Sequence, residues 1–137
     1  MQLKHVALTS SSEKNADTFY ADLLGLTKSE PKVLPLDLSR AIFNLDSELV
    51  MINYQDEHVH FEIFVTPSRG KSSPKIAHTC LEVDNSKVFL EKCRSLNLDI
   101  AQIPKGDKML TFIKDFDGNL FEIKRSALLE DRHASQD

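Results

Sequence analysis

The sequence predicts an α+β fold of two tandem βαβββ modules, which form a cupped mixed sheet with the helices on its outer face. Three observations lead to this prediction. The order of expected strands and helices before residues 67–75 recurs after them, and short stretches of sequence recur with it. The length of 137 residues suits one domain. We therefore expect a single domain over 1–137, with module 1 at about 1–67, a linker at 67–75, module 2 at about 76–125 and a tail at 126–137.

The first module is expected to begin with a strand over residues 2–9. A cluster of capping residues follows at 10–13, and apolar residues then recur at helical spacing: Ala16, Phe19, Tyr20, Leu23 and Leu24. Gly25 stands where a helix commonly ends. These signals predict an amphipathic helix over 13–24.

The rest of the first module is predicted to be mainly strand. Residues 26–33 indicate a short strand that ends at the prolines Pro31 and Pro35. A short helix can follow over 37–43. Two further strands are expected, over 48–54 and 59–66, joined as a hairpin by the polar turn 55–58.

The second module repeats this order. We expect a strand over 76–83, then a helix that is capped by Asp84, Asn85 or Ser86. Strands are predicted over 98–104, 109–114 and 120–124, and the Asp117-Gly118 pair is a strong signal for the last hairpin turn. Residues 127–137 are polar and indicate a frayed tail.

Local sequence recurs at the two ends of each module. His5-Val6-Ala7-Leu8 resembles His78-Thr79-Cys80-Leu81, and Phe61-Glu62-Ile63 recurs as Phe121-Glu122-Ile123. The first module has the longer separation between its His and its Glu, and the segment 35–45 can account for the extra residues. This recurrence indicates duplication of one supersecondary unit.

Side chains that alternate along strands place one His and one Glu of each module on the sheet face away from the helices. The residues are His5 and Glu62 in the first module, and His78 and Glu122 in the second. Two imidazoles and two carboxylates form a ligand set that suits Zn, Ni, Co, Mn or Fe(II) and leaves positions for water or substrate. A divalent metal site follows as the hypothesis.

Other side chains on these faces are weaker candidates. His58 and His60 share the face of Glu62 and could be ligands instead, although neither has a counterpart in the second module. Cys80 shares the face of His78 and is more typical of a small pocket-lining residue. The loop 105–108 could contact an anionic substrate or be a simple solvated turn.

Composition excludes several classes of function. Seventeen Lys and Arg against 21 Asp and Glu give a net charge of −4, so we expect no nucleic-acid partner. No apolar run approaches the roughly 18–20 residues of a membrane span, so no membrane association is expected. Two cysteines, Cys80 and Cys93, are typical of free thiols in a reducing cytoplasm.

The ordered set of motifs resembles the vicinal oxygen chelate superfamily, and its spacings resemble the glyoxalase I branch most closely. The matching stretches are Lys4-His5-Val6-Ala7-Leu8, Phe19-Tyr20 with Leu24-Gly25-Leu26, Phe61-Glu62-Ile63, Ile76-Ala77-His78-Thr79 and the run from Asp115 to Glu122. The resemblance implies the glyoxalase/bleomycin resistance/dioxygenase fold. It also implies one divalent metal on His5, Glu62, His78 and Glu122, and a homodimer.

The implied activity is that of a metal-dependent lyase or isomerase resembling lactoylglutathione lyase. A carboxylate beside the metal removes a proton from a hemithioacetal or a similar α-hydroxycarbonyl, and the cation stabilises the resulting enediolate. The resemblance assigns the base to Glu122, with Glu62 as the other candidate. Alternatives are an epimerase, another vicinal oxygen chelate enzyme such as a dioxygenase or an antibiotic-modifying enzyme, and a non-enzymatic small-molecule binding protein.

Three positions depart from the relatives. Glyoxalase I proteins usually carry an Arg and an Asn that help to hold glutathione, and this chain has Thr9 and Thr66 there. Glutathione is therefore not expected to be the preferred thiol. Fosfomycin-resistance relatives usually carry a Thr where this chain has Ala7, which weakens that alternative.

Overall fold

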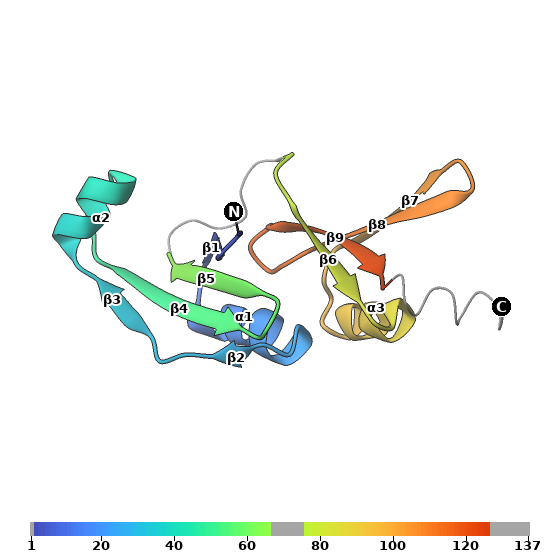
Figure 1. Cartoon of the computed structure of the whole chain (residues 1–137), viewed down its shortest axis with the longest axis horizontal. Coiled ribbons are helices and arrows are strands. Elements are labelled where there is room, and N and C mark those ends of the chain that lie inside the picture. Colours follow the sequence, from blue (N-terminus) through green and yellow to red (C-terminus); the bar gives the residue numbers. More distant parts are fainter. Residues whose placement is uncertain (1, 67–75, 127–137) are drawn as a thin grey trace. The chain divides into compact units, whose positions relative to one another are not determined.

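The structure is a computed structural model that describes residues 2–66 and 76–126. It divides into two compact units, residues 1–72 and 73–137, and Figure 1 labels their strands and α-helices. The predicted linker 67–75 and all but the first residue of the predicted tail lie outside the described residues. Each unit contains one mixed sheet with a helix packed against it, which confirms the predicted α+β fold of two repeated modules.

The sheet of the first unit is built around β5 (His60–Val65). β1 (Val6–Ser10) pairs with it in parallel and β4 (Leu49–Gln55) in antiparallel orientation. The far edge of β4 carries two short strands, β2 (Thr27–Lys28) and β3 (Lys32–Leu34). The single strand predicted over 26–33 is therefore wrong in detail, because proline lacks the N–H that a continuous ladder needs at position 31.

The first helix has the predicted extent but an unexpected geometry. α1 (Glu13–Ala16) begins at Ser12, whose hydroxyl caps the first turn, and it continues as the π-helix η1 (Asp17–Leu23). At the end of η1 the Leu24 N–H donates to the Phe19 carbonyl, five residues back, at 3.0 Å. The wider turn still buries its main apolar side chains, which are Phe19, Tyr20 and Leu23.

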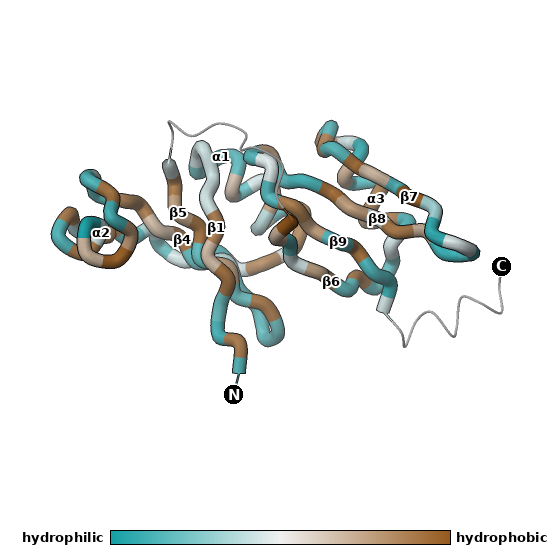
Figure 2. Tube along the Cα trace, turned by 90° about the horizontal axis from the view of Figure 1, so that it is seen from above, coloured by the Kyte–Doolittle hydropathy of each residue, from teal (hydrophilic) through white to brown (hydrophobic). Residues whose placement is uncertain are grey.

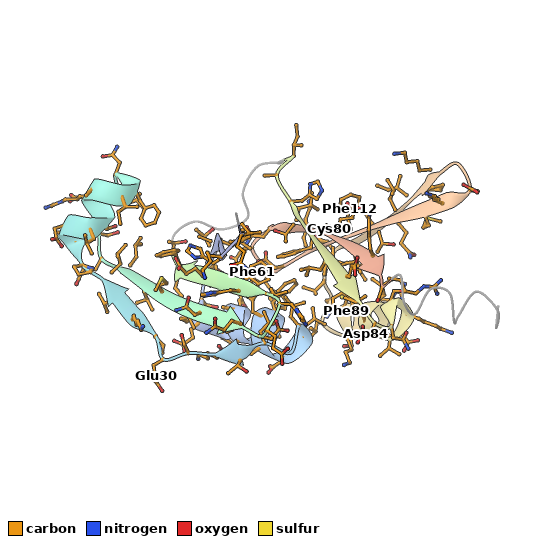
Figure 3. All side chains as sticks on the ribbon, in the orientation of Figure 1. Glu30, Phe61, Cys80, Asp84, Phe89 and Phe112 are labelled. Atoms are coloured by element: carbon orange, nitrogen blue, oxygen red, sulfur yellow. The ribbon has the colours of Figure 1, made fainter. Side chains whose placement is uncertain are left out.

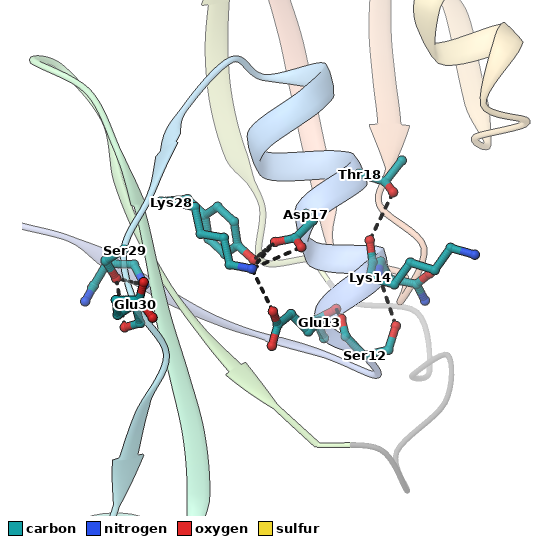
Figure 4. A network of polar contacts seen from close by, with 12 residues as sticks. Ser12, Glu13, Lys14, Asp17, Thr18, Lys28, Ser29 and Glu30 are labelled. Atoms are coloured by element: carbon teal, nitrogen blue, oxygen red, sulfur yellow. Dashed lines mark hydrogen bonds and ion pairs between the residues drawn. The ribbon is translucent and has the colours of Figure 1, made fainter.

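Polar side-chain contacts connect α1 and η1 to the strands β2 and β4 (Figure 4). The buried Tyr54 hydroxyl donates to Asp17 Oδ1 at 2.8 Å. Lys28 Nζ donates to the other oxygen of Asp17 at 3.1 Å and to Glu13 Oε2 at 2.7 Å. The hydrogen bond to Glu13 is the main cause of a raised pKa of Lys28. The core beneath is aromatic, with the Tyr20 ring 5.6 Å from Tyr54.

The predicted short helix is present as α2 (Leu36–Phe43), and it ends at Asn44 in the left-handed conformation, with φ 56°. It lies at one end of β4 in Figure 1. The Phe43 ring packs edge-on against Phe64 at 5.3 Å. Phe64 lies two residues after Glu62 in β5, so both side chains are on the same face of the sheet. α2 therefore covers one end of the face that carries Glu62.

The second unit repeats the architecture with fewer strands. β6 (Thr79–Val83) pairs in parallel with β9 (Leu120–Arg125), and β8 (Lys108–Lys114) joins β9 to β7 (Ile100–Lys105) in antiparallel orientation. α3 (Ser86–Ser95) begins at Asn85, whose side chain accepts from the Val88 N–H at 3.1 Å. Apolar and polar residues alternate along the strands of both units (Figure 2). No described helix is long and apolar enough to cross a membrane.

Candidate functional site

The first unit brings His5 and Glu62 together. His5 directly precedes β1, and Glu62 lies in the middle of β5. The parallel register places Ala7 beside Glu62, so the His side chain two residues earlier reaches the same carboxylate. The distance from His5 Nε2 to Glu62 Oε2 is 3.4 Å, with the side chains 43% and 20% exposed.

The second unit brings His78 and Glu122 together in the same way. His78 directly precedes β6, and the parallel register places Cys80 beside Glu122. The distance from His78 Nε2 to Glu122 Oε2 is 3.7 Å, and the side chains are 36% and 18% exposed. Each predicted His–Glu pair therefore has the same register, although each His lies just before its strand rather than within it.

A backbone carbonyl fixes the His78 ring. Nδ1 of His78 lies 2.8 Å from the carbonyl oxygen of Ile76. A carbonyl can only accept, so Nδ1 carries the hydrogen, and the neutral ring then has its lone pair on Nε2. Nε2 is the atom that faces Glu122. An imidazole held through its other nitrogen is the usual arrangement for a metal-ligating histidine.

Two further polar side chains lie beside the pair of the first unit. The His60 ring lies 5.6 Å from the His5 ring, centroid to centroid, at an interplanar angle of 57°. His60 Nε2 lies 2.7 Å from Asn53 Oδ1, and Asn53 is the register partner of Glu62 in β4. The sequence interpretation missed Asn53. The antiparallel register across the turn 55–58 was the signal that could have found it.

The pair of the second unit has different neighbours. The Phe112 ring meets the His78 ring edge-on at a centroid distance of 5.7 Å. Phe112 and Cys80 flank Glu122 on the neighbouring strands (Figure 3). Cys80 is exposed, and partial burial of its thiol, followed by the charge of Glu122, raises its pKa. A raised pKa disfavours the thiolate, the form that binds a metal.

The other candidates lie apart from these pairs. His58 is exposed in the β4–β5 turn, where its backbone N–H donates to Asp56 at 2.8 Å. Thr66 is buried, with its N–H donating to the Ser10 carbonyl at 2.8 Å. Within the described ranges its hydroxyl has no hydrogen-bond partner. Thr9 is exposed.

A cavity of about 1040 Å³ lies within the second unit, with Glu122 in its wall. β8 and β9 share three register pairs where β4 and β5 share six, and the residues beyond these pairs line the cavity together with Ser86 and Leu90 of α3. The two strands diverge beyond Phe112, and the predicted loop 105–108 contributes to the lining. Four of the lining residues are cationic: Lys105, Lys108, Lys124 and Arg125.

Each unit by itself supplies two of the four predicted ligands. Over residues 2–66 and 76–126, no three His, Cys, Asp or Glu side chains are grouped so that they could hold a metal ion. Both pairs consist of an imidazole nitrogen and a carboxylate oxygen at 3.4–3.7 Å on a partly exposed sheet face. Such pairs can bind a cation only as part of a larger ligand set.

Solved structures share this fold over nearly the whole chain. A glyoxalase family protein from Bacillus cereus is 13% identical, with a TM-score of 0.70 and coverage of 91% of this chain and 93% of that one. The fosfomycin resistance protein FosX from Mesorhizobium loti is 13% identical, with a TM-score of 0.67 and coverage of 96% and 97%. A FosX variant from Listeria monocytogenes, solved with Mn(II) and 1S,2S-dihydroxypropylphosphonic acid, is 16% identical, with a TM-score of 0.68 and the same coverage.

These identities establish similarity of fold alone. No curated protein matches the sequence significantly. The family model of the Glyoxalase/Bleomycin resistance protein/Dioxygenase superfamily matches residues 2–123, which is most of the chain and includes all four residues of the two His–Glu pairs. The chain belongs to this superfamily, whose members include metalloenzymes.

Proposed function

We propose that this protein is a metal-dependent lyase or isomerase of the glyoxalase I type, in which His5, Glu62, His78 and Glu122 hold one divalent cation. The observation that carries the proposal is the recurrence of one His–Glu contact at the same strand register in both units. The strand register places each His beside its Glu, but stability alone would not require a His–Glu contact in both units. A shared ligand set explains the repetition.

The residues fit such a cation. Imidazole nitrogen and carboxylate oxygen are ligands of Zn, Ni, Co, Mn and Fe(II). His78 presents the lone pair of Nε2, because its Nδ1 hydrogen is committed to the Ile76 carbonyl. All four side chains are partly exposed, so a cation can reach them. The presence of Mn(II) in the FosX variant of the same fold supports this choice.

The chain's own groups would perform the proton transfer. When bound, the cation would supply Lewis-acid stabilisation of negative charge on the substrate's vicinal oxygens. Glu122 takes a proton from the carbon that bears the hydroxyl of a hemithioacetal or similar α-hydroxycarbonyl, and returns it to the neighbouring carbon. Its position in the wall of a cavity of about 1040 Å³ supports this role, since a small substrate has room beside it. Glu62 is the other candidate for the base.

The complete ligand set joins residues of two units, so assembly is part of the proposal. We propose a homodimer, in which the second copy can contribute to the site, and a cytoplasmic location, consistent with the free thiols of Cys80 and Cys93. Light scattering on the metal-free and metal-loaded protein tests the dimer. A monomer in both states would contradict it.

Metal analysis of purified protein tests the site. We expect about one bound divalent ion per chain, lost in His5→Ala and in His78→Ala and retained in His58→Ala, the matched control in the exposed turn. Isomerisation of hemithioacetals of several thiols then tests the activity. Full metal occupancy in both ligand variants would refute the site. A metal-loaded protein that isomerises none of them would favour the epimerase, dioxygenase or antibiotic-modifying alternatives, and a metal-free protein a binding role.

A further inference from the structure

The two candidate histidine ligands are held in different ways. The ring of His78 is fixed by its own chain, through the hydrogen bond from Nδ1 to the Ile76 carbonyl. In the part of the chain that the structure describes, His5 makes no such hydrogen bond. Its backbone precedes β1 and is not in the sheet ladder. Its described side-chain contacts are with Glu62 and the ring of His60.

His60, in contrast, is firmly held. It lies in β5, opposite Gln55 of β4, and is half-buried. Its Nε2 lies 2.7 Å from Asn53 Oδ1, and because an amide oxygen only accepts, Nε2 is the donor. The backbone of Asn53 is tied in turn to Ser29, with its N–H donating to the Ser29 hydroxyl at 3.1 Å and its carbonyl accepting from the Ser29 N–H at 2.8 Å.

We propose that His60, oriented by Asn53, is the positioning residue for His5. Its ring limits the rotation of the His5 imidazole and keeps Nε2 of His5 directed toward Glu62. In the first unit a neighbouring ring thus does what the Ile76 carbonyl does in the second. The inference rests on the proposed function in one respect, the assignment of His5 as a metal ligand. His60 itself is not a ligand through Nε2, since that atom is committed to Asn53.

Cation affinity of the full chain tests the proposal. Co²⁺ and Zn²⁺ dissociation constants are measured by competition with a chromophoric chelator, and the Co²⁺ absorption spectrum reports the ligand set. Loss of a partner that orients a ligand typically weakens metal binding about 10–100-fold. We expect a loss in that range for His60→Ala, with the number of ions per chain unchanged, and a smaller loss for Asn53→Ala. His58→Ala, two residues away and exposed, is the matched control and should bind as the unmodified chain does.

A further variant separates the ring from its hydrogen bond. His60→Phe keeps a ring beside His5 but cannot bond Asn53, so it should recover most of the affinity that His60→Ala loses. Adding Asn53→Ala to His60→Phe should change nothing more, because Asn53 acts only through His60. Circular dichroism confirms that each variant folds. Unchanged affinity in His60→Ala would overturn the proposal. Complete loss of the ion in His60→Ala, the result expected for His5→Ala, would also overturn the proposal, since His60 would then be a ligand.

A measurement on the metal-free protein distinguishes failure of this inference from failure of the proposed function. Long-range ¹H–¹⁵N NMR should show His60 carrying its hydrogen on Nε2, and the ring signals of His5 should shift in Asn53→Ala but not in His58→Ala. If the chain binds no cation while these signals behave as expected, the proposed function fails and the positioning contact stands. If the His5 signals are insensitive to both His60→Ala and Asn53→Ala, the positioning role is refuted whatever the metal does.

Discussion

Replacing Glu122 by Gln separates the role of a base from that of a ligand. Gln has nearly the shape of Glu, and residue 122 lies between Cys80 and Phe112 on the neighbouring strands, so the fold should be retained. The amide keeps an oxygen toward the cation but cannot take up a proton near neutral pH. Removal of a general base costs about 10²–10⁴-fold in rate. That loss corresponds to about 3–5 kcal/mol on the activation barrier.

The assay follows proton transfer directly. The isomerisation rate of whichever hemithioacetal the unmodified chain accepts is measured with hydrogen and with deuterium on the carbon that bears the hydroxyl, and variants are compared at saturating cation so that weaker metal binding does not contribute. Glu82→Gln is the matched control, because Glu82 is exposed in β6 and its register partner is Lys124. Glu62→Gln should lose less rate than Glu122→Gln. If Glu62→Gln is the inactive variant, the two carboxylates have opposite roles. If both stay active, the proton-transfer mechanism is wrong.

Three further predictions concern the thiol, the core and alkaline pH. The kcat/KM for the glutathione hemithioacetal should stay below about 10⁴ M⁻¹s⁻¹, because buried Thr66 cannot supply the amide expected at this position from the resemblance to glyoxalase I. A kcat/KM above that value in steady-state kinetics would contradict this. Tyr54→Phe should lower the free energy of unfolding by about 1.5–3 kcal/mol in urea titrations, since the hydrogen bond to the Asp17 carboxylate is lost; an unchanged free energy of unfolding would contradict this. Burial raises the pKa of Cys93 to about 11 from 9.0. Burial of the neutral Cys93 thiol therefore contributes fully to the free energy of unfolding below about pH 9, and this contribution is lost as pH rises toward 11. Cys93→Ala should reduce the pH dependence of the free energy of unfolding over this range.

The part of the site that alternation along a strand determines was predictable from the sequence. Each His lies beside the Glu of its own unit, on the face that alternation predicts, although the predicted strands began too early. That the four side chains share one cation stays a prediction. An error in the first residue of a strand does not change which side chains share a face, because the side-chain period and the parallel register still place each His beside its Glu. The repeat helped further, since two weak signals at matching places reinforce each other.

Two features of the structure, the π-helix and the contact of Asn53 with His60, were not predicted in this way. Seven residues do not separate the period of a π-helix from that of an α-helix, so η1 was expected to be α-helical. The contact of Asn53 with His60 depends on the register between β4 and β5, which the length of the turn at 55–58 sets.

The same register supports different surroundings in the two units. In β4 the residue opposite Glu62 is Asn53, whereas in β8 the residue opposite Glu122 is Phe112. One neighbour fixes an imidazole through a hydrogen bond, and the other packs directly against the ligand ring. Backbone pairing alone therefore suffices to bring each His to its Glu, and the flanking residues are free to differ. It follows that substitutions at 53 and 112 should adjust how tightly a cation is held, whereas substitutions of the paired residues themselves should decide whether it binds at all.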